Sequence, residues 1–306
     1  MTQKELLYVK TIAEEKSISK AAKKLYITQP SLSQAIQRIE ETLGIELFMR
    51  TTRGLILTYA GERYYQLATK ILKMYEDFEI EISDINNLKT GRISIGITTY
   101  LATYVLPIVL PEFKAICPFI DVYIFEKNST ELESSLLLGE VDFAIMHEPT
   151  KINCAQINYE PLLKDPFLLT INPNHPLVNE GKHLPGYNYP LIDLRLFKNE
   201  PFIMLNKEQR IRHVVDKIFK KANLEPKITL TLKNFETAKR LASEGLGATF
   251  IPLQYSKISS SDFKPAYFYI DEFYEASWTM CIATNKNGFL SRADKLFIKL
   301  LKEKIS

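Results

Sequence analysis

Residues 17–33 read SISKAAKKLYITQPSLS, and this stretch predicts two helices joined by a tight turn. Ala21 and Ala22 place small side chains on one face of the first helix, which lets a second helix approach closely. Thr28 can cap the second helix, and Pro30 fits its first turn, where a missing N–H costs nothing. We therefore expect a helix-turn-helix whose second helix opens with polar residues.

The sequence on either side of this stretch supports the same domain. Apolar residues of the segment 4–15 recur at helical spacing, which predicts a helix before the motif. Within the second helix, apolar residues recur at steps of four, three and four before Gly44, namely Leu32, Ile36, Ile39 and Leu43. Residues 46–58 read ELFMRTTRGLILT, which predicts two short strands around a basic turn and so a wing.

The polar face of the second helix and the basic turn predict contacts with DNA. Glutamine can pair with adenine, serine with several base edges, and arginine with guanine or phosphate. The helix exposes Gln29, Ser31, Ser33, Gln34, Gln37 and Arg38, and the turn offers Arg50 and Arg53. An ordinary solvated helix face has a similar composition, so the helix by itself leaves both interpretations open.

Charge is distributed unevenly, although the net charge of the whole chain is only +3. Residues 1–58 contain nine Lys or Arg and six Asp or Glu, whereas residues 59–88 contain three and six. A small basic head followed by an acidic segment is the layout expected when one domain contacts DNA.

Residues 59–89 predict one long helix that joins two chains into a dimer. Neither Gly nor Pro occurs between Glu62 and Leu88. Apolar residues recur every 3.5 positions, namely Tyr64, Ala68, Ile71, Tyr75, Phe78, Ile82 and Ile85. This period is typical of a coiled-coil seam, so we expect dimerisation through residues 59–88.

From residue 90 onward, strand-like and helix-like segments alternate, which predicts an α/β fold with a parallel sheet and helices on both faces. The expected strands are 92–97, 120–125 and 141–146, and the expected helices between them are 101–117 and 129–139. The chain is expected to enter a second unit near residue 161. Because late strands often return to complete the first sheet, we divide this region into a first subdomain, residues 90–161 and 266–306, and a second, residues 162–265.

The sequence argues against several classes of protein. No run of about 18 apolar residues exists, so no membrane span is expected. The N-terminus, MTQKELLYVK, lacks the apolar stretch of a secretory signal, and we expect a cytoplasmic protein. Cys117, Cys154 and Cys281 lie far apart, which argues against a disulfide framework. The four histidines have no metal-ligand spacing, so we expect no metal and no cofactor.

Many positions of the N-terminal region match one family signature. They are Ser17, Ser19, Ala21, Ala22, Leu25, Thr28, Gln29, Pro30, Ser31, Ser33, Ile36, Glu40, Leu43, Gly44, Leu47, Phe48, Arg50, Leu57, Thr58 and Gly61. Together they resemble the signature of LysR-type transcriptional regulators. Weaker landmarks of the same family follow at residues 91–93, 131–132, 139–145, 175–177, 245–247 and 251–252, so the resemblance covers essentially the whole chain.

The resemblance implies a winged helix-turn-helix, a linker helix and an effector domain like a periplasmic binding protein, with a cleft between its two subdomains. It implies DNA contacts by Thr28, Gln29, Pro30, Ser31, Ser33, Gln34, Arg38, Arg50 and Arg53. It also implies a dimer or tetramer that binds an interrupted palindrome in double-stranded DNA and responds to a small molecule. RNA polymerase stays open as a further partner.

Effector contacts are expected beyond the carboxyl ends of the strands, where ligands of α/β folds bind. The candidates are Thr98, Thr99, Tyr100, Asn128, Ser129, Met146, His147, Leu205, Asn206 and Gly247. Hydroxyls and helix N-termini favour anions, so we expect a small organic anion. Simple helix capping by these hydroxyls and a structural role for His147 remain open. Lys127 and Asn128 stand where many family members have glycine, which leaves the shape of the cleft open.

Three other functions are compatible with parts of the sequence. An enzyme would need a nucleophile with a base, a metal cluster or a phosphate loop, and the chain has no Walker-type loop. A solute-binding transport protein would need a secretion signal. Redox sensing through Cys117 or Cys154 is a further hypothesis. We expect a transcriptional regulator that is not an enzyme.

Overall fold

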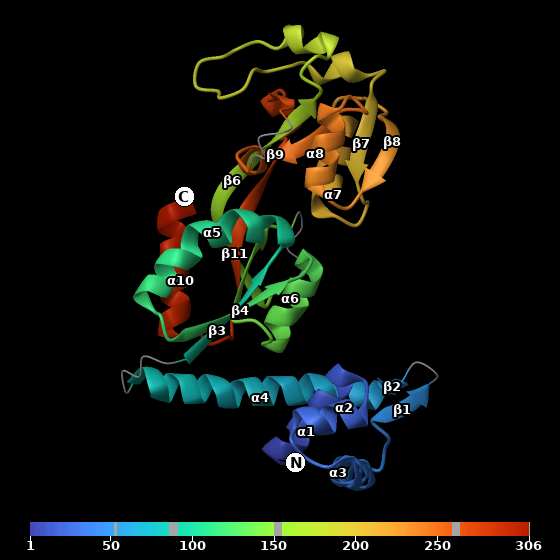
Figure 1. Ribbon diagram of the computed structural model, residues 1–306, viewed down its shortest axis with the longest axis vertical. Helices are drawn as coiled ribbons and strands as arrows, with labels where there is room; N and C mark the ends of the chain where they lie inside the picture. Colours follow the sequence, from blue (N-terminus) through green and yellow to red (C-terminus); the bar gives the residue numbers. More distant parts are fainter. Residues whose placement is uncertain (52–53, 86–90, 150–154, 259–263, 306) are drawn as a thin grey trace.

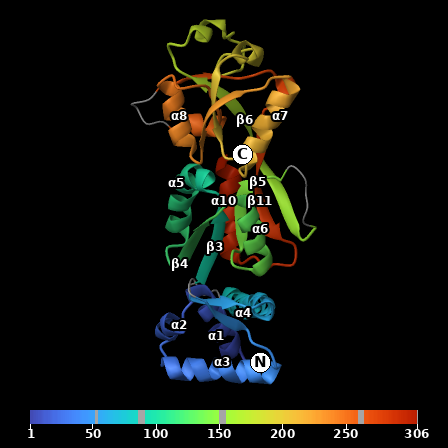
Figure 2. The same ribbon diagram turned by 90° about the vertical axis from the view of Figure 1, so that its right-hand side faces the viewer.

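The computed structural model describes residues 1–51, 54–85, 91–149, 155–258 and 264–305, and for residues 80–85 the backbone alone. A helical head packs on one long helix, which runs across the longest axis of the molecule, and a body of two lobes follows along that axis (Figure 1). The head lies at one end of the molecule and the second lobe at the other (Figure 2). The first lobe therefore lies between the long helix and the second lobe.

The head is a winged helix-turn-helix. Its elements are α1 (Gln3–Glu15), α2 (Ile18–Lys24), α3 (Gln29–Leu43), β1 (Phe48–Thr51) and β2 (Gly54–Leu57). The three helices begin after Thr2, Ser17 and Thr28, whose side chains each accept a backbone N–H of the first turn. Ala21 and Ala22 are buried between helices, and Leu32, Ile36 and Ile39 are buried on the inner face of α3.

The long helix α4 (Tyr59–Ile85) has 27 residues, which corresponds to a length of about 40 Å. The apolar residues that recur every 3.5 positions along α4 fall into two groups, one buried in the head and one exposed to solvent. Tyr64 and Ala68 are buried in the core of the chain's own head, together with Leu72. Tyr75 and Phe78 remain exposed, as do Leu67 and Met74 on the same side of the helix. Together they thus do not form a single seam, because those of the first group already pack within the chain.

The first lobe is built on the strands β3 (Gly91–Ile97), β4 (Ile120–Glu126) and β5 (Phe143–His147), which are parallel to one another. The strand β11 (Ser277–Asn285) then pairs antiparallel with β5 and with the long strand β6 (Ile157–Ile171). The expected parallel arrangement is thus confirmed for β3, β4 and β5, while the sheet as a whole is mixed because β11 is antiparallel to its neighbours. The physical reason is that β11 returns from the second lobe, so it enters the sheet from the opposite end.

Helices cover both faces of this sheet. On one face, α5 (Thr99–Ile116) and α10 (Arg292–Ile305) pack on Ile93, Ile95 and Phe143. On the other face, α6 (Ser129–Leu138) packs on Ala144, Met146, Cys281 and Ala283. Alternate residues of β5 and β11 thus face opposite layers, as the pleat of a strand requires.

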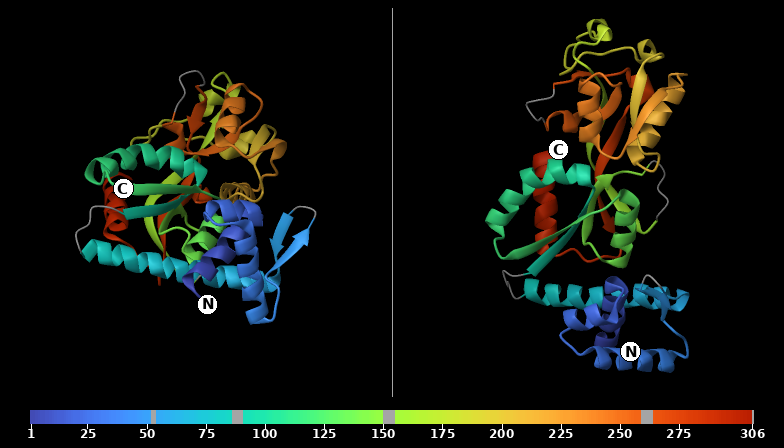
Figure 3. Two further views of the ribbon diagram at one scale, coloured as in Figure 1. Left: turned by 60° about the horizontal axis from the view of Figure 1, so that its bottom comes forward. Right: turned by 45° about the vertical axis from the view of Figure 1, so that its right-hand side comes forward.

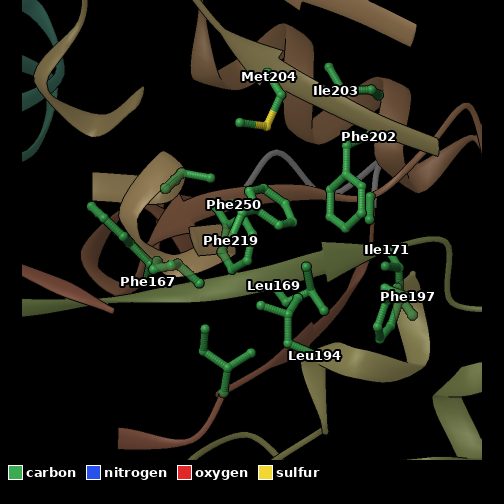
Figure 4. Packing of buried hydrophobic residues seen from close by; sticks show 14 of the residues in the cluster. Phe167, Leu169, Ile171, Leu194, Phe197, Phe202, Ile203, Met204, Phe219 and Phe250 are labelled. Carbon is green, nitrogen blue, oxygen red and sulfur yellow. The ribbon is translucent and has the colours of Figure 1, made fainter. Parts of the chain in front are cut away.

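The second lobe continues from β6, whose last residues pair with β9 (Thr249–Pro252) and β10 (Ala266–Phe268). Its other elements are β7 (Pro201–Leu205), β8 (Lys227–Leu232), α7 (Arg210–Lys221), α8 (Phe235–Ser243), α9 (Leu253–Ser256) and the 3₁₀ turns Pro176–Glu180, Leu194–Phe197 and Glu272–Tyr274. Side chains from β6, β7, α7 and β9 meet in one hydrophobic core, with Phe167, Phe202, Phe219 and Phe250 at its centre (Figure 4). Residue 161 lies inside β6, so the chain passes from one lobe to the other within a continuous strand.

Candidate DNA-binding surface and effector site

The outer face of α3 presents the polar residues that the sequence selected. Thr28, Gln29, Pro30, Ser31, Ser33, Gln34 and Arg38 are all exposed. The Thr28 hydroxyl caps α3 and lies 2.8 Å from the Ser31 hydroxyl. The Ser19 hydroxyl donates to Gln29 Oε1 at 2.7 Å, which ties the first residue of α3 to α2. Together these exposed residues make up what we call the α3 surface.

The wing is held against the helices by backbone and carboxylate contacts. The Leu55 N–H donates to the Lys16 carbonyl at 3.2 Å. Glu40 on α3 accepts the N–H of Leu47 at 2.7 Å and that of Phe48 at 3.2 Å. Arg50 is exposed on β1. Arg53, the other predicted wing contact, lies outside the described residues.

The two lobes meet at a group of aromatic side chains that we call the lobe junction. It consists of Tyr100, His147, Phe235, Tyr255 and Trp278. The His147 ring stacks on Trp278 with 3.4 Å between centroids and faces Tyr100 at 5.8 Å. Tyr100 and His147 come from the first lobe, whereas Phe235 and Tyr255 come from the second.

Two buried polar atoms near the lobe junction lack a hydrogen-bond partner among the described residues. They are Thr98 Oγ1, which follows β3, and His147 Nε2, at the end of β5. Burial, and then the positive charge of Arg210, lowers the pKa of His147 well below its ordinary value, so the imidazole is neutral. An unsatisfied buried polar group costs free energy, and a ligand that supplied a partner would recover it.

The other predicted effector residues have mixed environments. Asn128 caps α6 and shares a capping box with Glu131, so its side chain serves the helix. Thr99 and Ser129 begin α5 and α6. Met146 and Leu205 are buried in the hydrophobic cores, and Tyr100 points inward, donating its hydroxyl to Asp165 at 3.0 Å.

Gly247 and Asn206 have backbone roles. Gly247 adopts φ +152°, and a Cβ there would lie 2.8 Å from the Pro201 carbonyl oxygen, so it permits a close approach of two chain segments. The Asn206 N–H donates to the Leu232 carbonyl at 2.9 Å. Neither contact by itself points to a ligand.

Sequence reasoning missed two charged residues at the lobe junction. Arg210, the first residue of α7, donates to the His147 carbonyl and lies 2.5 Å from Glu133 Oε1 on α6. Asp165 is only 2% exposed and accepts from Tyr100, from the Gln254 N–H at 3.0 Å and from Trp278 Nε1 at 3.4 Å. Burial raises the pKa of the Asp165 carboxyl. No local pattern marks either residue, because each partner lies far away in the sequence.

The described part of the chain offers little evidence for metal binding, membrane insertion or redox sensing. There, no group of three or more His, Cys, Asp or Glu residues could hold a metal ion, and no helix is long and apolar enough to cross a membrane. Burial raises the pKa of the Cys281 thiol to about 12, and Cys117 is half-buried. A thiol with a raised pKa is a poor redox sensor, which argues against Cys281 and leaves the hypothesis for Cys117 untested. Cys154 lies outside the described residues.

The fold and the polar α3 surface define a class of protein, namely a winged helix-turn-helix regulator with a two-lobed binding domain. Residues 3–62 match the family model of the bacterial regulatory helix-turn-helix protein, LysR family, and residues 86–306 match the LysR substrate binding domain. The chain belongs to the LysR family of transcriptional regulators. It is therefore a DNA-binding regulator and not an enzyme, as the sequence predicted.

Individual relatives agree with this assignment. The chain is 28% identical to the uncharacterized HTH-type transcriptional regulator YcgK of Bacillus subtilis, over 100% of this chain and 95% of that protein. Full-length OxyR from Pseudomonas aeruginosa has a TM-score of 0.75 at 23% identity, covering 100% of this chain and 94% of that one. The regulator CbnR in complex with its target DNA has a TM-score of 0.69 at 19% identity, covering 99% and 100%. At these identities the two structures show the fold alone.

Proposed function

We propose that this regulator acts as a dimer that binds a symmetric DNA site and responds to a small organic anion at the lobe junction. The proposal of an anion depends most on Arg210. Its guanidinium joins the second lobe to the first at the His147 carbonyl, and the ring of His147 carries a buried nitrogen that lacks a partner among the described residues. A carboxylate is a natural partner for a guanidinium that already has the geometry to bind one.

The proposed effector contacts keep some of the residues predicted from the sequence, leave others out and add Arg210. Thr98, Thr99, Ser129 and His147 supply hydroxyls, helix N-termini and a neutral imidazole from the first lobe. Arg210 supplies the positive charge from the second lobe. Met146 and Leu205 are left out, because each is buried in a hydrophobic core.

The proposed dimer uses the exposed apolar side of α4, with Leu67, Met74, Tyr75 and Phe78. These four side chains are between 47% and 70% exposed in the single chain. Two copies that bury this side would bring two α3 surfaces onto one face of DNA, and two-fold symmetry of the protein favours a palindromic site. Assembly to a tetramer and contact with RNA polymerase remain predictions, as does a cytoplasmic location, which a protein working on DNA would require.

Thermal unfolding with paired probes tests the effector proposal. Benzoate and succinate are compared with their amides, benzamide and succinamide, which keep the shape and remove the charge. A carboxylate present at 100 times its Kd should stabilise the protein by about 2.7 kcal/mol. We expect that response to vanish in Arg210→Gln and to persist in Arg195→Gln, a control at an exposed arginine of the same lobe. Equal responses to acid and amide, or none to either, would contradict an anionic effector of this class.

A further inference from the structure

Helix α4 and the first lobe meet at one largely buried ion pair. The Lys73 ammonium on α4 contacts the Asp142 carboxylate of the first lobe and lies 3.1 Å from Asp77. The Lys73 side chain is 14% exposed and that of Asp142 only 6%. Figure 3 shows α4 running beneath the first lobe, so this contact lies between the part of the chain that includes the head and the part that includes the lobe junction.

The first lobe is shaped to receive this lysine. Gly139 ends α6 with φ +73°, and a Cβ there would lie 2.7 Å from Lys73 Cγ. Asp142 also accepts the Ser94 N–H at 2.6 Å, which fixes the orientation of its carboxylate. The glycine and the aspartate of the segment 139–145 thus serve the contact with α4. A second bridge, between Arg92 and Glu76, lies at the exposed edge of the same contact.

The charges at this contact contribute little to the free energy of unfolding, but they favour one orientation of α4 on the first lobe. One ammonium serves the carboxylates of Asp77 and Asp142, and the buried carboxyl of Asp294 lies close enough to interact with Asp142 and Lys73. A buried ion pair gains little net stability, because desolvation offsets the attraction. Removing one partner, however, leaves a buried charge without compensation. The contact is therefore selective for one orientation of α4 on the lobe.

The same strands link this contact to the lobe junction. Asp142 immediately precedes β5, which ends at His147, and five residues of strand span about 16 Å. Ser94, which donates to Asp142, lies on β3, whose carboxyl end leads into Thr98. A displacement of either strand at the junction would therefore also move the partners of Lys73.

We propose that Lys73 and Asp142 form a regulatory latch, which holds α4 and the DNA-binding head in one orientation on the first lobe. Binding of an effector at the lobe junction shifts β3 or β5 and weakens the latch, which frees α4 to move. The effector part of this inference rests on the proposed function above. The latch itself is a property of the chain without ligand and is tested without one.

Three variants of the full-length chain separate the latch from simple loss of charge. Lys73→Met keeps the aliphatic stem over Gly139 and removes the ammonium. Lys73→Met combined with Asp142→Asn removes both charges of the bridge between α4 and the first lobe and keeps an acceptor for Ser94, so this variant should fold. Asp77, on α4 itself, loses the Lys73 ammonium equally in both variants. Lys70→Met is the matched control, because Lys70 is exposed on the same helix.

Hydrogen exchange of the α4 amides over residues 73–79 is measured first. We expect both Lys73 variants to exchange at least about tenfold faster than the wild type, with the Lys70 variant unchanged, because an undocked helix opens more readily. DNA affinity is then measured on a duplex that the wild-type protein has selected from a random library. We expect the Lys73 variants to differ from the wild type by at least about fivefold.

Unchanged exchange in both Lys73 variants would overturn the latch. Faster exchange with unchanged DNA affinity would overturn its regulatory role, since the orientation of α4 would then not control the head. Failure of the selection to yield a preferred duplex would contradict the proposed function instead, and the exchange result would still decide whether Lys73 latches α4.

Discussion

The Arg210 guanidinium on α7 lies 2.5 Å from the Glu133 carboxylate on α6, and the two residues belong to different lobes. Glu133 also accepts the Tyr159 hydroxyl at 2.9 Å. The Glu133 carboxylate is thus already paired with Arg210, the cation that we propose binds the effector. An effector carboxylate that binds Arg210, as we propose, would have to displace Glu133, whose bridge to Arg210 joins the two lobes.

Replacing Glu133 should strengthen effector binding. We expect Glu133→Gln to raise the affinity for a responsive carboxylate severalfold, because the effector no longer displaces a charged group from Arg210. Titration calorimetry measures this, with Glu126→Gln as a control at an exposed glutamate of the same lobe. A fall in affinity would indicate that Glu133 contacts the effector directly and does not compete with it.

Glu40 should be required for the fixed position of the wing. Its carboxylate accepts the N–H groups of Leu47 and Phe48, and Glu40→Ala leaves both without that acceptor. We expect the free energy of unfolding of the head to fall by about 1–3 kcal/mol. Urea denaturation followed by circular dichroism checks this, with Glu46→Ala as the exposed control. Equal urea midpoints for Glu40→Ala and Glu46→Ala would contradict this, since they would show that water replaces the Glu40 hydrogen bonds with no loss of stability.

Tyr26 should be a site of backbone strain in the turn before α3. It adopts φ +55° while its side chain is 96% exposed, so no packing compensates the left-handed conformation. Tyr26→Asn should raise the free energy of unfolding by about 1 kcal/mol, since asparagine tolerates this conformation better. Thermal unfolding measures the gain. Tyr26→Phe keeps the strain and should match the wild type, and a stabilisation as large as that of Tyr26→Asn would contradict this explanation.

Stability should depend on pH through Asp294. Burial, and then the negative charge of Asp142, raises the pKa of Asp294 from 3.8 to about 7. Between about pH 4 and pH 7 the folded state therefore binds a proton that the unfolded state has released. The free energy of unfolding contributed by this group accordingly falls as the pH rises through that range and stays low above it.

Urea denaturation at pH 5.5 and pH 8 tests the role of Asp294. We expect Asp294→Asn to flatten this pH dependence and to be more stable than the wild type at pH 8, since the amide can still accept the Ser291 N–H that Asp294 accepts at 2.8 Å. Asp121→Asn, at an exposed position, should leave the dependence unchanged. A pH dependence that survives in Asp294→Asn would assign it to other groups.

The head could be predicted from the sequence because its determinants are local. The expected helix over Gln29–Leu43 agrees with α3, since Thr28 and Gly44 mark its two ends. The expected long helix agrees with α4 to within a residue at its start. Which apolar residues of α4 are buried in the head and which are exposed could not be predicted, because this depends on how α1 packs on α4.

The lobe junction and the latch could not be predicted for a related reason. Arg210 and Glu133 are 77 positions apart, and Lys73 and Asp142 are 69 apart. Only the return of β11 to the first sheet and the docking of α4 bring such residues together. Thr98 and His147, both selected from the sequence at strand ends, carry buried polar atoms that lack a partner among the described residues.

The most direct test of the account is the affinity of the full chain for a duplex selected from a random library, compared with a shuffled duplex, over a range of salt concentrations. We expect two symmetric half-sites, an affinity ratio of at least about 10³, and a steep loss of affinity with salt. Arg38→Ala should lower the salt slope by about one. Equal affinity for selected and shuffled duplexes would contradict sequence-specific recognition by the α3 surface.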